Sequence, residues 1–277
     1  MKKIISVLFI LLLAACTEKE GEEIVRIQPE FKVSVIPRLN DLSGAVFSEY
    51  DCVGVYMVQA GTFQVIDGYG NIPYEINILG ELKAIDKVIY SALKGSYWQS
   101  EKVDFVAYYP YNELFSSGWL DIARGDNSKA MNFMYAKSSS LDYDIANVEL
   151  NFKSPLSKII LTVERDQSVE ELDFSKVTVE TGHIYTYAQF DMFEEKLKGK
   201  GFLGPIPAKP ILFGSRYELY LFPDTVTENN PIHVYVKLNN EYKEYFKWSF
   251  PVGTVLEGNT TYEFTVNINS SGIDGWY

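Results

Sequence analysis

Apolar and polar residues alternate along much of the chain with a period of two, which is the pattern of half-buried β-strands. The clearest case is the segment 261–268, in which every second residue is apolar. An early segment, 31–36, follows the same pattern. Its alternating apolar positions are Phe31, Val33 and Val35. The pattern predicts an all-β protein built as an antiparallel β-sandwich, with residues 81–93 as one segment whose apolar spacing also allows a short helix.

The segment 232–250 predicts a β-hairpin whose register follows from its apolar positions. In one register the apolar residues of the two strands lie opposite each other, whereas a shift of one residue sets them opposite charged residues. A three-residue loop at 239–241 meets this condition and places Val234 opposite Phe246. A slip of one residue would send every side chain to the wrong face, so we predict this register.

The chain has 277 residues, which is enough for two domains of ordinary size or for one large all-β unit. The alternation stops at two places, at 151–155 and in the polar stretch 164–168, and domain boundaries fall in such stretches. We place the boundary near residue 164. We therefore expect an N-terminal β-sandwich domain over residues 25–164 and a C-terminal β-sandwich domain over residues 165–277.

Residues 1–15 have the three parts of a secretory signal peptide: basic residues at the start, an apolar run, and small residues before Cys16. The apolar run is shorter than the roughly 20 residues that a spanning helix needs, although a single anchor helix is the alternative. The sequence Leu-Ala-Ala-Cys that ends at Cys16 resembles the lipobox of bacterial lipoproteins. This resemblance implies that Cys16 is acylated and becomes the first residue of the mature chain.

Residues 16–24 follow as a mostly polar and acidic segment, which predicts a disordered tether. The segment resembles the acidic export tag of Bacteroidetes lipoproteins, and a plain solvated linker is the alternative. With acylated Cys16 as its anchor, the protein is expected at the cell outer membrane as a surface-exposed lipoprotein.

Charge and composition exclude several functions. The chain carries 25 basic and 37 acidic side chains, a formal net charge of −12, which gives no support to nucleic-acid binding. The two histidines, His183 and His233, and the two cysteines, Cys16 and Cys52, cannot form a Cys/His zinc site of the usual ligand count. We expect no metal, no cofactor and no enzymatic activity.

Several motifs of this sequence resemble those of the fimbrillin-like lipoproteins of Bacteroidetes, which are subunits of type V pili, and they occur in the same order along the chain. They lie at residues 50–56, 104–111, 133–137, 148–159 and 256–264. The resemblance implies two transthyretin-like seven-stranded sandwiches in tandem. It also implies a structural or adhesive subunit of a surface fimbria, with other pilus subunits as partners and a host or bacterial surface ligand as a further one.

The resemblance further implies assembly by β-strand exchange, in which an arginine-directed protease cuts after an early strand and a neighbouring subunit's strand takes its place. In this sequence the segment carrying Phe31, Val33 and Val35 is the exchangeable strand, and Arg38 is the candidate cleavage site. An anchor subunit that is never cut at Arg38 is the alternative. A second reading of the whole chain is a surface glycan-binding lipoprotein that acts through exposed aromatic residues such as its tryptophans.

Overall fold

The computed structural model describes residues 30–35, 47, 50–66, 69–77, 79–85, 102–115, 119–123, 133–142, 147–167, 173–212, 215–238, 245–269 and 272–276. This part of the chain is almost entirely β-strand, with one short 3-10 turn, η2 (Phe174–Lys176). The all-β prediction is therefore confirmed.

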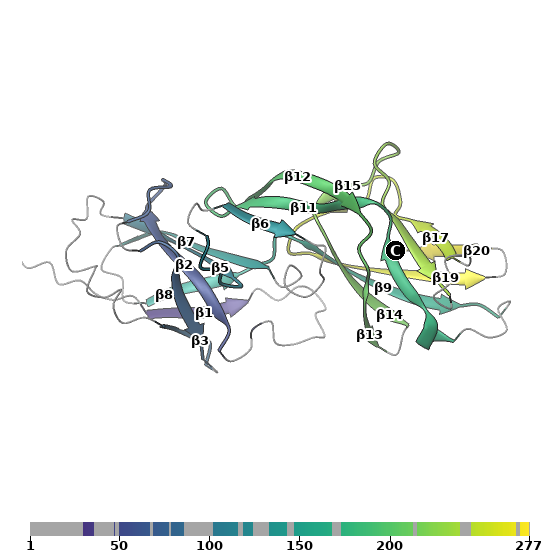
Figure 1. Cartoon of the computed structure of the whole chain (residues 1–277), viewed down its shortest axis with the longest axis horizontal. Helices are drawn as coiled ribbons and strands as arrows, with labels where there is room; N and C mark the ends of the chain where they lie inside the picture. The colour runs from purple at the N-terminus through teal and green to yellow at the C-terminus, as the bar shows by residue number, and fades with distance from the viewer. Residues whose placement is uncertain are drawn as a thin grey trace, which may run out of the picture.

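The strands fall into two bodies that lie end to end along the long axis of the molecule (Figure 1). The first body contains β1 (Glu30–Val35), β2 (Cys52–Gln59), β3 (Ile72–Ile76), β4 (Glu81–Ala84), β5 (Lys102–Tyr109), β7 (Met134–Asp142) and β8 (Asn147–Phe152). The second body contains β6 (Trp119–Ala123), β9 (Ser157–Arg165), β10 (Thr178–Thr181), β11 (Ile184–Asp191), β12 (Lys196–Gly204), β13 (Lys209–Leu212), β14 (Arg216–Leu221), β15 (Asp224–Thr225), β16 (His233–Lys237), β17 (Tyr245–Ser249), β18 (Val255–Leu256), β19 (Thr261–Asn269) and β20 (Gly272–Trp276).

The first body is one seven-stranded sheet in the order β7-β5-β2-β3-β4-β1-β8. The sheet curls until its two edges meet, where Tyr135 of β7 and Lys153 after β8 exchange backbone hydrogen bonds of 2.9 Å in both directions. The curled sheet encloses an apolar core of alternate strand residues. This first core includes Val55, Phe105, Ala136, Val148, Leu150 and Phe152.

The second body is a sandwich. Its five-stranded sheet, β13-β14-β9-β19-β20, packs against the three-stranded sheet β10-β16-β17. The second core lies between them and contains Trp248, whose ring centroid lies 4.8 Å from that of Phe250 and 5.3 Å from that of Phe264. The alternation predicted over 261–268 is confirmed in β19, where Tyr262, Phe264, Val266 and Ile268 are buried.

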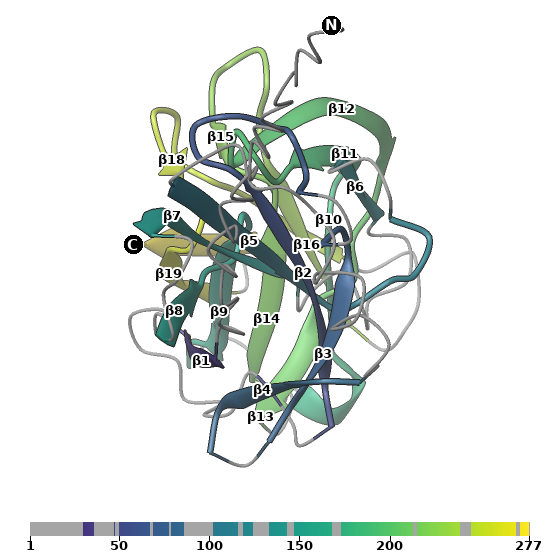
Figure 2. The ribbon, with the colours of Figure 1, turned by 90° about the vertical axis from the view of Figure 1, so that its left-hand side faces the viewer.

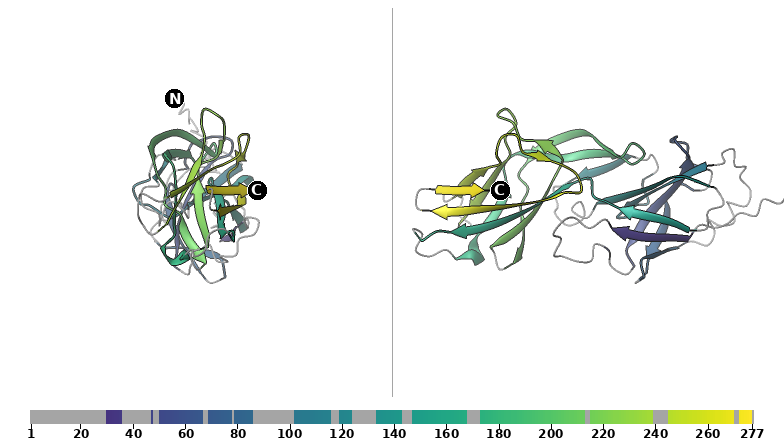
Figure 3. Two further views of the ribbon diagram at one scale, coloured as in Figure 1. Left: turned by 90° about the vertical axis from the view of Figure 1, so that its right-hand side faces the viewer. Right: turned by 180° about the vertical axis from the view of Figure 1, so that it is seen from behind.

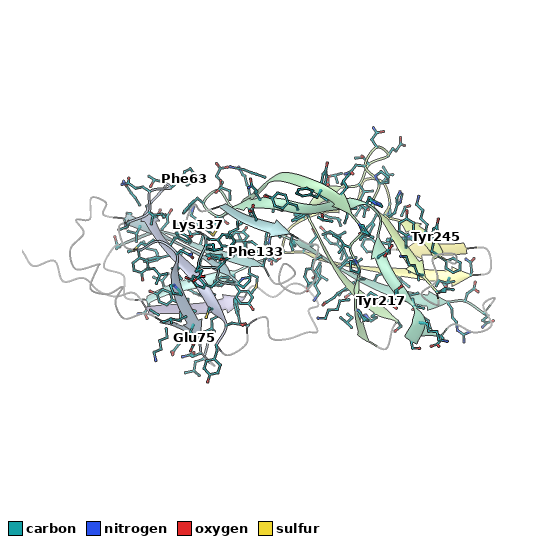
Figure 4. All side chains as sticks on the ribbon, in the orientation of Figure 1. Phe63, Glu75, Phe133, Lys137, Tyr217 and Tyr245 are labelled. Carbon is teal, nitrogen blue, oxygen red and sulfur yellow. The ribbon has the colours of Figure 1, made fainter. Side chains whose placement is uncertain are left out.

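Strand β6 joins the two bodies. It comes from the N-terminal half of the sequence, yet it pairs antiparallel with β11 along its whole length and completes the sheet β12-β11-β6. Beneath it lies a third apolar cluster, here called the shared cluster. The shared cluster contains Tyr56, Val58, Val106, Tyr108, Leu120, Ile122, Phe133, Tyr135, Leu156, Ala188, Phe190, Met192, Tyr220 and Phe222, so both bodies contribute to it. Phe133 lies on the side of the first body that faces the second (Figure 4).

The two bodies share one topological feature. In each, an early strand lies parallel to a late strand: β1 to β8 and β9 to β19. The other registered pairs of the described strands are antiparallel. Because β9 pairs with β14 and β19 from Ser157 onward, the boundary expected near residue 164 falls at the end of a strand that already lies in the second body.

The register predicted for the hairpin of β16 and β17 is wrong by two residues. Val234 pairs with Trp248 rather than with Phe246, and Lys237 pairs with Tyr245. This register excludes the predicted loop at 239–241, although the connection itself lies outside the described residues. Because the shift is even, each side chain keeps its face, and Val234 and Trp248 are both buried as the alternation requires.

The segment that allowed a helix begins with strand β4 instead. Leu82 and Ala84 are buried while Glu81 and Lys83 are exposed, which is the period of a strand. Residues 86–93 lie outside the described part of the chain.

Candidate functional site

The exchangeable strand expected from the sequence is β1, which carries Phe31, Val33 and Val35. It lies inside the first body's sheet, between β4 and β8, rather than at an edge. Seen end-on from the first body, β4, β1 and β8 follow one another along one side (Figure 2), and the view from behind shows β1 beside β8 (Figure 3). Cys16 and Arg38, the predicted lipidation and cleavage sites, lie outside the described residues.

The pairing with β8 runs the full length of β1. All six residues of β1 are in parallel register with residues 147–152. This register sets residues 31, 33 and 35 beside Val148, Leu150 and Phe152, which are 2%, 0% and 0% exposed. Adjacent residues of paired strands share a face of the sheet, so the apolar alternation of β1 coincides with the core face of β8.

The pairing with β4 is shorter. Phe31 pairs with Leu82 and Lys32 with Glu81 in antiparallel register. Leu82 belongs to the first core, so the neighbours of position 31 on both sides are buried. Removal of β1 would leave the main-chain edge of β8 unpaired and would uncover apolar residues of both flanking strands, which is the kind of site that an added strand occupies.

After β1, Phe47 packs against the first body. The ring of Phe47 makes edge contacts with Tyr109 and Phe152 at centroid distances of 5.1 Å and 5.2 Å. The Tyr109 hydroxyl donates a hydrogen bond of 3.1 Å to Asp51, and burial together with this carboxylate raises the pKa of Tyr109 to about 12. Residues 36–46, which include Arg38, therefore connect β1 to a fixed point of the first body.

Sequence reasoning missed Phe47 and its contacts with Tyr109 and Phe152. Phe47 stands outside any alternating run, and the only signal was a short apolar segment, Ala45 to Phe47, shortly before β2. Its partners come from β5 and β8, which follow it by more than 50 residues, and a local pattern does not specify such distant contacts.

The motif residues that connect the two bodies also come together. Ser154 donates its backbone N–H to the Asn259 side chain at 3.2 Å, and the Asn259 N–H donates to the Leu156 carbonyl at 3.0 Å. The backbone of Asn259 is left-handed, with φ 55°, a conformation that Asn tolerates. The segment after β8 is thus held against the turn before β19.

The described residues contain no cluster of three or more His, Cys, Asp and Glu side chains that could hold a metal ion. Cys52, at the start of β2, is a free thiol. Within the described part of the chain, no helix has the length and apolar character needed to cross a membrane.

The architecture defines a class: two-body β-proteins in which an N-terminal strand lies within the first sheet between two later strands. The sequence matches the fimbrillin-like family over residues 41–275, and the chain belongs to that family. No curated protein sequence matches it.

Solved structures share the fold at low sequence identity. A candidate cell adhesion protein of Bacteroides uniformis superposes with a TM-score of 0.70 at 20% identity, covering 90% of this chain and 96% of that one. One from Bacteroides ovatus gives a TM-score of 0.67 at 19% identity, with 90% and 95% covered. The tip fimbrial protein Mfa3 of Porphyromonas gingivalis, with a C-terminal truncation, gives 0.50 at 8% identity, with 90% and 98% covered.

Proposed function

We propose that this protein is a structural or adhesive subunit of a surface fimbria, without enzymatic activity, that assembles by exchange of strand β1. The fimbrillin-like family supports the fimbrial part of the proposal, and the similar structures of a tip fimbrial protein and of candidate cell adhesion proteins agree with it. In this proposal the partners are other subunits of the same fimbria, and the fold is a pair of transthyretin-like domains in tandem.

One observation supports strand exchange above all: β1 is paired on both sides within a sheet whose other strands all come later in the chain. A single cut at Arg38, which lies between β1 and β2 in the sequence, would separate β1 from the rest of the protein. A strand from a second subunit could then pair with β8 in the same register and cover Val148, Leu150 and Phe152.

Limited digestion with an arginine-specific protease tests this proposal. The wild type is expected to be cut after Arg38 and to elute as oligomers or aggregates in size-exclusion chromatography, because the vacated position exposes apolar surface. Arg38→Ala is expected to remain monomeric, and Arg26→Ala, which changes an arginine before β1, is expected to behave as the wild type.

A synthetic peptide with the sequence of residues 30–36 adds a second arm. Supplied during digestion, it is expected to refill the position and keep the cut protein monomeric. A wild type that is cut after Arg38 and still elutes as a monomer without the peptide would overturn strand exchange through β1. Resistance of Arg38 to the protease would identify the uncut anchor subunit instead.

The proposal also includes export as a lipoprotein anchored in the outer membrane through acylated Cys16. Durable attachment needs more than one acyl chain, which a lipoprotein's modified cysteine supplies. Cys16→Ala is therefore expected to abolish membrane attachment, measured by fractionation and by mass spectrometry of the mature N-terminus. Undiminished attachment of this variant would contradict the lipoprotein assignment.

A further inference from the structure

A pocket of about 400 Å³ opens on the second body, within the size range of small-ligand sites. The start of β11, the end of β12, strands β15 and β16 and the turn 227–230 surround it. Its most buried lining residues, Leu221, Phe222 and Ile232, are apolar. The rest of the lining adds Ile184, Leu203 and Pro231 to polar and aromatic residues, so the pocket combines apolar surface with hydrogen-bonding groups.

The aromatic part of the wall consists of Tyr185 and Tyr235. Tyr185 is 37% exposed, which leaves much of its ring accessible to a ligand. Tyr235 is held in place by an edge contact with Tyr245, at a centroid distance of 5.4 Å. Tyrosine presents an apolar ring and a hydroxyl together, which suits a ligand with both apolar and hydroxyl-bearing faces.

The charges at the pocket pair with each other. Asp224 accepts a hydrogen bond of 3.1 Å from the Lys200 ammonium group and one of 2.8 Å from the Thr225 N–H. The same ammonium group donates to the Pro223 carbonyl at 2.6 Å and lies 5.8 Å from the centre of the Tyr185 ring. Because Lys200 and Asp224 neutralise each other, the pocket favours an uncharged ligand over a phosphate or a carboxylate.

Both histidines of the chain line the pocket. His233 shares a hydrogen bond of 2.8 Å between Nδ1 and the Ser249 hydroxyl. Burial, and to a smaller extent the charge of Lys247, lower the pKa of His233, which agrees with a neutral imidazole at the pocket.

Two neighbouring amide side chains, of Asn229 and Asn230, line the pocket. The backbone groups of Thr227 and Asn230 bond each other in both directions, at 3.2 Å and 3.3 Å, and this closes a tight turn. The turn exposes Asn229 and Asn230 on the pocket wall. Each amide is both a donor and an acceptor, and two adjacent amides can bond a pair of neighbouring hydroxyl groups.

We propose that this pocket binds a neutral saccharide. A sugar ring has an apolar C–H face that can lie against Tyr185 and a rim of hydroxyl groups that the amides, the imidazole and the Asp224 carboxylate can bond. The volume suits one or two sugar units, and the neutral charge balance fits a saccharide without acidic groups. The pocket lies on the second body, away from β1, so the inference is independent of strand exchange.

An array of immobilised oligosaccharides tests the proposal with the full-length protein. The array carries malto-, cello- and galacto-oligosaccharides and N-acetylglucosamine oligomers as neutral probes, and sialylated oligosaccharides as acidic ones. The wild type is expected to bind at least one neutral probe. Isothermal titration with the same oligosaccharide free in solution shows whether the sugar alone is recognised or only its surface-attached form.

Tyr185→Ala and Asn230→Ala are expected to weaken this binding at least tenfold, whereas Tyr185→Phe, which keeps the ring, is expected to retain most of it. Tyr50→Ala is the matched control, because Tyr50 is an exposed tyrosine of the first body, outside the pocket. Thermal melts confirm that the variants are folded. The proposal is overturned if no neutral probe binds, if both pocket variants bind as the wild type does, or if only sialylated probes bind.

Discussion

At the scale of single residues, Lys158 and Glu218 are two charged side chains buried on the neighbouring strands β9 and β14. The Lys158 ammonium lies 3.6 Å from the Glu218 carboxylate, and the two side chains are 3% and 7% exposed. Exposed Lys209 approaches the same carboxylate from outside at 3.2 Å. Removing one member of a buried pair leaves the other without its partner in an environment of low polarity, which typically costs about 3–5 kcal/mol.

We predict that Glu218→Gln lowers the free energy of unfolding by roughly 3 kcal/mol in denaturant titrations. Lys209→Ala is expected to change it by less than about 1 kcal/mol, because exposed ion pairs contribute little. The double variant Lys158→Met with Glu218→Leu should recover most of the loss. Equal effects of Glu218→Gln and Lys209→Ala would show that the pair is not effectively buried.

Buried tyrosines make stability depend on alkaline pH. The Tyr217 hydroxyl donates a hydrogen bond of 2.9 Å to the Val177 carbonyl, and burial raises the pKa of Tyr217 to about 12. Tyr56, whose hydroxyl donates to Phe115 at 2.7 Å, has its pKa raised to about 12 by burial and, less, by Tyr111. Tyrosine in an unfolded chain titrates near about pH 10.

The pKa of each of these tyrosines is higher in the folded state than in the unfolded chain. The contribution of its protonated hydroxyl group to the free energy of unfolding is therefore complete below about pH 10 and is lost as the pH rises to about 12. We predict that the free energy of unfolding falls in this window by about 1.4 kcal/mol per pH unit for each such tyrosine, as measured by denaturant titrations. Tyr217→Phe should be less stable by about 1 kcal/mol near neutral pH but should show a shallower decline. Parallel curves for the two proteins would contradict the assignment.

At the scale of secondary-structure elements, the sequence predicts a strand well wherever one of its faces is buried. The segments of β1 and β19 alternate strictly in sequence and both form strands, and in β19 the apolar positions are the buried ones. The hairpin of β16 and β17 was predicted on the right faces but two residues out of register, because an even shift leaves the apolar pattern unchanged. Only the position and length of the connecting loop separate such registers.

Other elements could not be predicted from local patterns. Leu82 in β4 belongs to a spacing that fits a helix as well as a strand, and its pairing with β1 decides between them. The pairing of β6 with β11 joins segments more than 60 residues apart, which no local period specifies. The saccharide pocket is likewise assembled from β11, β12, β15 and β16, so its residues look unrelated along the sequence.

The corrected hairpin supports a prediction with a matched control. Val234 is fully buried opposite Trp248, whereas Val255 of β18 is 51% exposed. We predict that Val234→Asp lowers the free energy of unfolding by several kcal/mol, because it buries an unpaired charge, and that Val255→Asp changes it by about 0.5 kcal/mol or less. Denaturant titrations measure both. Similar losses in the two variants would place Val234 outside the core.

At the scale of the whole molecule, the two bodies are joined by apolar and polar contacts. The ring of Phe190 on β11 lies 4.5 Å from that of Tyr135 and 5.4 Å from that of Phe133, both in the first body. The turn after β11 adds a hydrogen bond of 3.2 Å from the Lys137 ammonium to the Phe193 carbonyl and an ion pair of 2.8 Å between Lys153 and Glu195.

Asp191 holds this turn in shape. Its carboxylate accepts the N–H groups of Phe193 and Glu194, each at 3.0 Å, and the Lys198 ammonium at 2.9 Å. Burial alone would raise the pKa of Asp191, but the hydrogen bonds from Glu194, Lys198 and Phe193 hold it below its usual range. These hydrogen bonds therefore fix the conformation of the turn that contacts the first body.

We predict that the wild type unfolds in a single calorimetric transition and that Phe190→Ala splits it into two, because the truncation opens a cavity in the shared cluster. Phe250→Ala makes the same truncation within the second core and should lower the melting temperature without splitting the transition. A single transition for Phe190→Ala would mean that the coupling between the bodies does not depend on the Phe190 ring.

The parallel pairing of β1 with β8 also affects the order in which the strands of the first body pair during folding. Glu30 pairs with Asn147, so contact forms only after a loop of 147 − 30 = 117 positions has closed. Closing such a loop costs about 3 kcal/mol more in chain entropy than closing a four-residue hairpin. A pairing of this separation forms late in folding, since nearby contacts offset their smaller entropy loss first. Until this pairing forms, the place beside β8 that β1 occupies is therefore open to whichever strand reaches it.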